Sequence, residues 1–146
     1  GASAQDIIAL AASVGQRSHL YACLSTLKYL AMSGRVGYLA AGMASLLDFK
    51  PILTVREGKL DMLERVRTRK RAWERVINLT AEALQGKRPE RMAILHVATP
   101  VDAAEFAAQL RSCADCPAEL PLVEITPGLS VHSGAGMVGV ALVAAP

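Results

Sequence analysis

Apolar side chains recur along this chain with two different periods, and each period predicts one kind of element. The helical period is clearest in residues 68–84, where Trp73, Val76 and Leu84 fall on one face together with other apolar residues. A glycine and a proline follow soon afterwards and predict the end of this helix. We therefore expect one long amphipathic helix in the middle of the chain.

Strand-like patterns occur on the N-terminal side of this helix. Two runs of strand type, residues 52–55 and 60–66, are separated by a short polar segment that contains Glu57 and Gly58. Such a pair between two apolar runs is typical of a tight β-hairpin. The hairpin excludes a purely parallel sheet.

The first segment carries signals for both ends of a helix. Ser3 is a suitable N-cap with Asp6 at the third helical position, and Gly15 can adopt the left-handed conformation that ends a helix. The chain has no initiating methionine and starts with a linker-like sequence. We therefore predict that a further domain precedes it in the complete protein.

The remaining apolar segments complete an α/β order. We expect helices at residues 26–32 and 36–47 and from residue 99, and strands at residues 20–24, 92–97, 122–125 and 138–143. The predicted fold is a mixed β-sheet with a hairpin, covered by helices, in a single domain over residues 1–146.

Composition supports a folded core and limits its chemistry. Apolar residues make up 52% of the chain and charged residues only 20%, which excludes a disordered protein. Aromatic residues make up 4%, so the core must be aliphatic. No apolar stretch reaches the roughly 18 residues of a membrane span, so no transmembrane segment is expected.

Positive charge is concentrated in one segment. Residues 64–75 contain six basic and two acidic side chains, so their net charge of +4 exceeds the +3 of the whole chain. If the preceding strand continued through this run, Arg65, Arg67 and Arg69 would share one face. Local charge of this kind indicates an anionic partner, although acidic neighbours in the fold would also compensate it.

Two further positions could bind an anion. Arg35 follows a glycine at a predicted helix–helix junction, where a guanidinium suits a carboxylate or a phosphate. His132 lies beside Ser133 and between glycine-rich residues in a predicted loop. Its imidazole could donate to a carboxylate, while the glycines would let backbone N–H groups approach.

Metal binding and redox chemistry are not indicated. His19 and His96 lack a second ligand at metal-binding spacing, and Cys113 and Cys116 form one C-x-x-C pair without a second pair. We therefore expect no metal and no cofactor, and we interpret the cysteines as reduced thiols of a cytoplasmic protein.

Several short motifs together, over nearly the whole chain, resemble the C-terminal domain of the DegV family, bacterial proteins that bind one fatty acid. They are residues 33–37 (SGRVG), 46–53 (LLDFKPIL), 56–59 (REGK), 65–71 (RVRTRKR) and 131–137 (VHSGAGM). In the last motif this chain has Ser133 and Ala135 where the family usually has Thr and Pro.

This resemblance implies a function that composition alone does not. It implies a lipid-binding, non-enzymatic component of phospholipid synthesis that presents a long-chain fatty acid to a fatty acid kinase, which phosphorylates it to an acyl phosphate. Arg35, His132 and Ser133 would contact the headgroup, and Arg65, Arg67 and Arg69 would dock the partner. The acyl chain would be lined by Leu39, Met43, Leu46 and Met137, and the protein's own N-terminal domain would complete the site.

Two other classes of function stay open from the residues. One is an anion- or nucleotide-binding enzyme domain that uses Arg35 and His132, although the chain lacks a phosphate-binding G-x-x-x-x-G-K motif. The other is an RNA-binding module based on residues 65–71. No aromatic stacking motif accompanies that charge, so a nucleic-acid partner is not expected.

Overall fold

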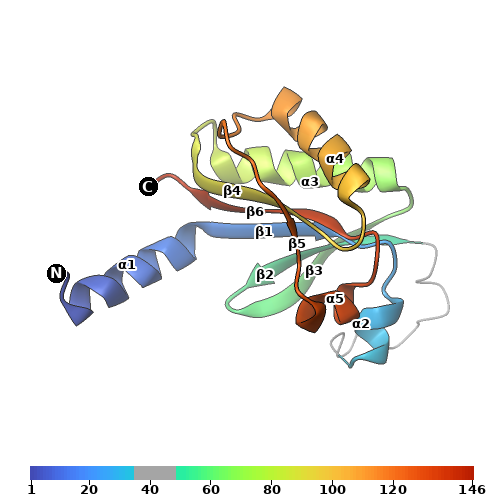
Figure 1. Ribbon diagram of the computed structural model, residues 1–146, viewed down its shortest axis with the longest axis horizontal. Coiled ribbons are helices and arrows are strands. Elements are labelled where there is room, and N and C mark those ends of the chain that lie inside the picture. Colours follow the sequence, from blue (N-terminus) through green and yellow to red (C-terminus); the bar gives the residue numbers. More distant parts are fainter. Residues whose placement is uncertain (35–48) are drawn as a thin grey trace.

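A computed structural model describes residues 1–34 and 49–146 (Figure 1). Its elements follow the order α1 (Ala4–Arg17), β1 (Ser18–Cys23), α2 (Lys28–Met32), β2 (Lys50–Arg56), β3 (Lys59–Val66), α3 (Arg69–Leu84), β4 (Pro89–His96), α4 (Pro100–Cys113), β5 (Leu122–Glu124), α5 (Pro127–Ser133) and β6 (Val138–Ala144). The predicted helix at residues 36–47 lies outside the described residues.

The strands within the described residues form one six-stranded mixed sheet in the order β3-β2-β1-β6-β4-β5. Only the pairing of β4 with β5 is parallel among these strands, and the other four pairings are antiparallel. The predicted hairpin between β2 and β3 is confirmed, with Glu57 and Gly58 both at positive φ, 51° and 72°. Both turn residues must adopt this conformation to match the twist of the strands.

One face of the sheet is covered by α3 and α4 (Figure 1). Thr68 caps α3 by accepting a hydrogen bond from the Arg71 N–H, and the predicted apolar face of this helix is buried. Trp73 of α3 meets Phe106 of α4 edge to face, with ring centroids 5.7 Å apart. These rings sit in the larger of two hydrophobic clusters, which lies between the helices and the sheet.

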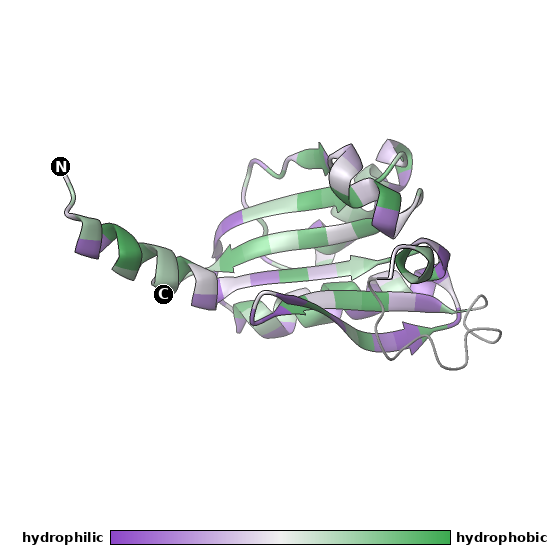
Figure 2. Ribbon diagram, turned by 90° about the horizontal axis from the view of Figure 1, so that it is seen from below, coloured by the Kyte–Doolittle hydropathy of each residue, from purple (hydrophilic) through white to green (hydrophobic). Residues whose placement is uncertain are grey.

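Among the described elements, the opposite face is covered at one end only. Figure 2 looks onto this face and shows α2 and α5 over one end of the strands, with the other end open. The second cluster of buried residues gathers here, with Leu24, Leu30, Leu53 and Met137 among its members. This half-covered face is where the sheet can accommodate something other than its own helices.

Helix α1 projects from the sheet as an arm (Figures 1 and 2). Ser3 and Asp6 form the predicted capping box. The expectation that Gly15 ends the helix is wrong, because α1 continues through Gly15 to Arg17 and passes directly into β1. Arg17 fixes this joint by donating hydrogen bonds to Glu90 at 2.8 Å and to the Ala144 carbonyl.

Candidate functional site

A cavity of about 420 Å³ lies between the half-covered sheet face and α5, and we call it the α5 cavity. Its lining is almost entirely aliphatic. The walls are formed by Leu20, Ala22, Leu24, Leu30, Leu53, Val55, Leu60, Leu95, Ile125, Gly128, Leu129 and Met137, together with His132 and Ser133. Two polar side chains therefore stand on the wall of an apolar slot, and Met137, predicted to line the acyl chain, is also on this wall.

His132 and Ser133 occupy the last turn of a helix. The expectation of a loop at this position is wrong, because Pro127 starts the seven-residue helix α5, which ends at Ser133. Proline at the first helical position is compatible with the helix because that residue's N–H would have no partner in the helix. Such a short helix has too few turns to show an apolar period.

The imidazole of His132 has an unsatisfied polar atom. Its Nδ1 is shielded from solvent and has no hydrogen-bond partner among the described residues. The adjacent Ser133 Oγ contacts the Leu129 carbonyl at the long distance of 3.4 Å. A buried polar nitrogen without a partner is unfavourable by about 1–3 kcal/mol. His132 as a residue lines the α5 cavity, but this nitrogen does not face its open space.

The glycines after α5 do not present free N–H groups. The Gly134 N–H donates to the Ser130 carbonyl at 2.8 Å, and the Gly136 N–H donates to the Val97 carbonyl at 2.9 Å. The expected approach of these two N–H groups to a ligand is therefore wrong. Both glycines instead have positive φ, 76° and 81°, in the turn that leads from α5 into β6.

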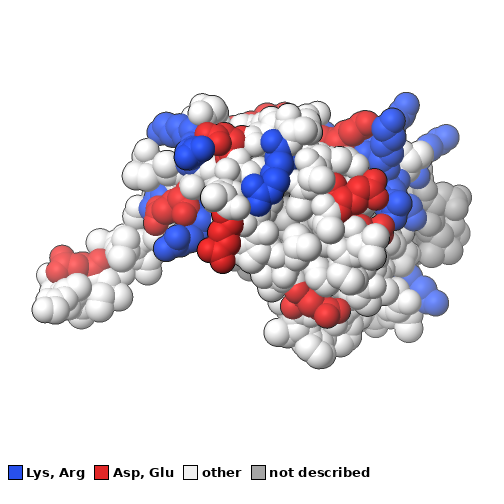
Figure 3. All heavy atoms as spheres, turned by 45° about the horizontal axis from the view of Figure 1, so that its top comes forward, with Lys and Arg blue, Asp and Glu red and all other residues white. Residues whose placement is uncertain are grey.

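The basic run is divided between two elements. Strand β3 ends at Val66 and Thr68 caps α3, so the condition under which Arg65, Arg67 and Arg69 share one strand face is not met. Figure 3 shows basic side chains gathered at the end of the molecule where β3 passes into α3. The charge is local, as predicted, but it is not a single row of arginines.

These arginines have different surroundings. Arg69 pairs with Asp102 at 2.7 Å and stacks over Trp73, with its guanidinium 4.9 Å from the ring centroid. Arg67 stacks over Phe49 at 5.9 Å, and Arg65 is exposed on β3. Arg69 therefore has an acidic partner within the fold, whereas Arg65 and Arg67 are exposed and form no ion pair among the described residues.

Acidic neighbours compensate Arg75, the last arginine of the basic segment. Arg75 donates to Glu64 at 2.7 Å and to Glu82 at 2.9 Å. These carboxylates raise the pKa of the Arg75 guanidinium, with the hydrogen bond that Arg75 donates to Glu64 as the largest cause. The part of the basic segment available to an anionic partner is consequently smaller than the sequence indicated.

Four predicted site residues cannot be placed. Arg35, predicted for the headgroup, and Leu39, Met43 and Leu46, predicted for the acyl chain, lie outside the described residues. The structure brings together His132, Ser133 and Met137, and it adds strand residues that sequence reasoning missed. The missed signal was the alternation of Leu20, Ala22 and Leu24 on one strand face.

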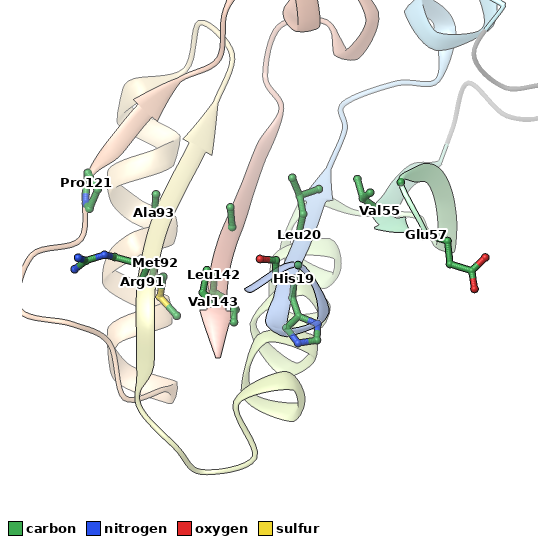
Figure 4. A pocket seen from close by; sticks show the side chains of 14 residues that line it. His19, Leu20, Val55, Glu57, Arg91, Met92, Ala93, Pro121, Leu142 and Val143 are labelled. Atoms are coloured by element: carbon green, nitrogen blue, oxygen red, sulfur yellow. The ribbon is translucent and has the colours of Figure 1, made fainter. Parts of the chain in front are cut away.

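A second hollow of about 700 Å³ lies on the open end of the same sheet face, and we call it the outer hollow (Figure 4). Its centre contains small and aliphatic side chains, among them Ala93, Ala141 and Val143. Its rim carries His19, Glu57 and Arg91, which Figure 4 shows around the aliphatic centre.

Within the described residues, the other side chains that could bind a metal or react do not gather into a site. No group of three or more histidine, cysteine or acidic side chains that could hold a metal occurs within the described part of the chain. All three cysteines are described and are free thiols, and burial raises the pKa of the Cys23 thiol to about 12. No helix within residues 1–34 and 49–146 is long and apolar enough to cross a membrane.

Comparison with known proteins gives consistent matches. Residues 1–145 match the family model described as an uncharacterised protein of the DegV family. A DegV domain-containing protein of Mycobacterium tuberculosis is 35% identical over 136 residues, which are 92% of this chain and 48% of that protein. The chain spans about half the length of the curated relatives it matches.

Solved structures share the fold. The crystal structure of a DegV family protein from Corynebacterium glutamicum superposes with a TM-score of 0.89 at 27% identity, covering 100% of this chain and 55% of that one. The structure of DegV from Bacillus subtilis, a fatty acid binding protein, gives a TM-score of 0.78 at 25% identity and covers 98% and 50% of the two chains.

Proposed function

This chain belongs to the DegV family, and on that premise we propose that it holds the alkyl chain of a long-chain fatty acid in the α5 cavity. The observation that carries the proposal is an aliphatic slot whose lining includes the polar residues His132 and Ser133. A fatty acid combines the two properties of this site, because it has one polar carboxyl group and a long apolar chain.

The lining of the α5 cavity supports an alkyl ligand energetically. Burying one methylene group contributes about 0.8 kcal/mol, so a long chain supplies most of the binding free energy without further polar contacts. The carboxylate would accept hydrogen bonds from His132 and Ser133, which lie side by side at the end of α5. Arg35 is our third proposed headgroup contact.

The fatty acid binding described for the Bacillus subtilis protein supports the same ligand here. We further propose that this chain is the C-terminal domain of a larger two-domain cytoplasmic protein whose N-terminal domain completes the headgroup site. In this proposal the chain itself performs no catalysis. A partner kinase phosphorylates the presented carboxyl group to an acyl phosphate used in phospholipid synthesis.

The exposed arginines support a docking role. Arg65 and Arg67 carry their charge at the surface, near the end of β3, where long-range attraction can steer an acidic partner. Arg69 was predicted with them, but its pairing with Asp102 leaves it less free to contact a second protein. We therefore propose Arg67 and Arg65 as the principal docking residues.

Native mass spectrometry of the full-length protein, purified without detergent, tests the proposed ligand. We expect one fatty acid per protein, released by organic solvent and identified in the extract. Bound nucleotide or co-purified RNA in its place would contradict the proposal and favour the anion-binding or RNA-binding alternatives. His132→Ala should reduce the lipid-bound fraction in the same spectrum, which connects the ligand to the α5 cavity.

A further inference from the structure

The α5 cavity and the outer hollow meet at two residues. Leu20 of β1 and Val55 of β2 line both spaces, and they lie on neighbouring strands where β1 and β2 pair. The boundary between the two spaces is therefore made of aliphatic side chains from the sheet floor. An apolar path continues from the α5 cavity into the outer hollow without crossing a polar barrier on that floor.

The two ends of this path differ in chemistry. His132 and Ser133 lie where α5 ends, next to α2, and Leu24 lies on the sheet at that end. Leu20 is four strand residues away from Leu24, which corresponds to about 13 Å along the sheet. A chain whose carboxylate sits at His132 would thus direct its other end toward Leu20 and Val55.

The floor of the outer hollow is formed by small side chains. Ala93 of β4 and Ala141 of β6 are register partners in the sheet, and Figure 4 shows Ala93 and Leu20 on strands that flank β6. Short side chains on adjacent strands leave a trough above the backbone. Val143 and Pro121 supply apolar walls around it.

We infer that the site accepts fatty acids longer than the α5 cavity alone can hold, with the far end of the alkyl chain passing Leu20 and Val55 into the outer hollow. This inference rests on the proposed fatty acid binding and adds a length preference to it. Leu20 and Val55 then act as the junction of the path, while Ala141 and Ala93 determine how much chain fits beyond it.

The expected length dependence follows from burial. Each additional buried methylene strengthens binding by at most about fourfold, and by less where one side of the chain faces solvent. Affinity should therefore continue to rise for acids that extend beyond the junction. A site that ended at Leu20 and Val55 would instead lose affinity once the α5 cavity was full.

The test uses the full-length protein and a matched pair of substitutions. Ala141→Phe fills the outer hollow from its floor, at a position that does not line the α5 cavity. Ala104→Phe places the same side chain at an exposed position of α4, on the other face of the sheet. Dissociation constants are measured for myristic, palmitic, stearic, behenic and lignoceric acid.

We expect Ala141→Phe to bind myristic acid like the wild type and to bind lignoceric acid at least about tenfold more weakly, since several methylenes lose their contact. Ala104→Phe should leave the whole series unchanged. If Ala141→Phe does not fold, Ala93→Leu provides a milder obstruction of the same floor and should produce the same trend.

Three results would overturn the inference. Equal affinity changes for short and long acids would show that the outer hollow takes no part in binding. Weaker wild-type binding of behenic than of palmitic acid would place the end of the site at the junction. A changed oligomeric state of Ala141→Phe with an unaltered length series would assign the hollow to a protein contact. Failure of the wild type to bind any acid would instead refute the proposed function itself.

Discussion

The ring of Tyr29 in α2 lies directly against Gly134, the residue that ends α5. A Cβ atom at position 134 would stand 2.6 Å from the Tyr29 Cε2 atom, closer than side chains pack. Gly134 also has φ 76° and ψ 165°, a conformation adopted almost only by glycine. This contact joins the two short helices above the half-covered sheet face. The position of α2 therefore depends on the absence of a side chain at Gly134.

The first prediction concerns this turn. Gly134→Ala should lower the free energy of unfolding by about 1–3 kcal/mol, because alanine is strained in this backbone conformation. Urea unfolding measures the loss. Gly15→Ala is the matched control, since nothing lies within 4 Å of its added Cβ and alanine favours a helix. An unchanged stability of Gly134→Ala would show that the turn relaxes without cost.

A double substitution separates the two sources of strain. Tyr29→Ala removes the ring against which the new methyl group would collide but leaves the backbone conformation in place. We expect Gly134→Ala to remain destabilising in the Tyr29→Ala background. Complete recovery there would assign the cost to the ring contact alone.

The second prediction concerns the headgroup. In the full-length protein, His132→Ala should weaken palmitic acid binding by about 1.5–3 kcal/mol through the loss of one charge-assisted hydrogen bond. Its unfolding free energy should not decrease, because the imidazole lies outside the main core and its Nδ1 has no hydrogen-bond partner to lose. Isothermal titration measures the affinity, and Asn78→Ala, at an exposed position of α3 on the other face of the sheet, is the control. Unaltered binding by His132→Ala would remove His132 from the headgroup site.

The third prediction separates the two arginines that follow β3. In the full-length protein, Arg67→Glu with Arg69→Glu should retain lipid but lose kinase-dependent acyl phosphate formation, and high salt should reproduce that loss in the wild type. Among the single variants, Arg67→Glu should carry most of the effect. Arg69→Glu should mainly lower stability, by at most about 1 kcal/mol, because its partner Asp102 is at the surface.

Lys59→Glu, in the β2–β3 hairpin, applies the same charge change away from the basic run and controls for net charge. The docking assignment is wrong if the double variant releases its lipid and still associates with the kinase. In that case the basic run belongs to the binding pocket.

The fourth prediction is a dependence of stability on pH. Burial raises the pKa of the Cys23 thiol from 9.0 to about 12, so the folded protein keeps this proton at pH values where the unfolded chain has released it. Its contribution is complete below pH 9.0 and is lost as pH rises toward about 12. The slope for one proton is about 1.4 kcal/mol per pH unit.

The measurement is the difference in unfolding free energy between the wild type and Cys23→Ala as pH increases. Subtraction cancels groups common to both proteins, including Tyr21, whose pKa burial also raises. The difference should shrink above pH 9.0. A constant difference would mean that solvent reaches the thiol in the folded state.

Local signals predicted most of the fold. The Glu57–Gly58 turn and the Ser3–Asp6 capping box depend on residues close in sequence, and both occur where expected. The prediction at Gly15 was wrong because the conformational freedom of glycine permits a helix to end there but does not require it. The chain continues in helical conformation to Arg17, whose hydrogen bonds to Glu90 and Ala144 come from distant segments.

The candidate site was less predictable because tertiary packing creates it. Strand alternation identifies which residues share a face but not which face α3 and α4 will cover. Only the position of α5 turns Leu20, Ala22 and Leu53 into the wall of a cavity. Likewise, the pairing of Arg69 with Asp102 joins residues 33 positions apart, so no local pattern in the basic run could distinguish Arg69 from Arg67.

The direct passage of α1 into β1 also has a consequence for how fast backbone amides exchange with solvent. No residue of α1 is buried against the described part of the chain, so its amides are protected only by the helix itself, which is marginally stable at 14 residues. Beyond the joint the same backbone pairs with β6 from Ser18 and also with β2 from Tyr21. Deuterium uptake should therefore change abruptly at the joint, being fast in the arm and slow from Tyr21 onward.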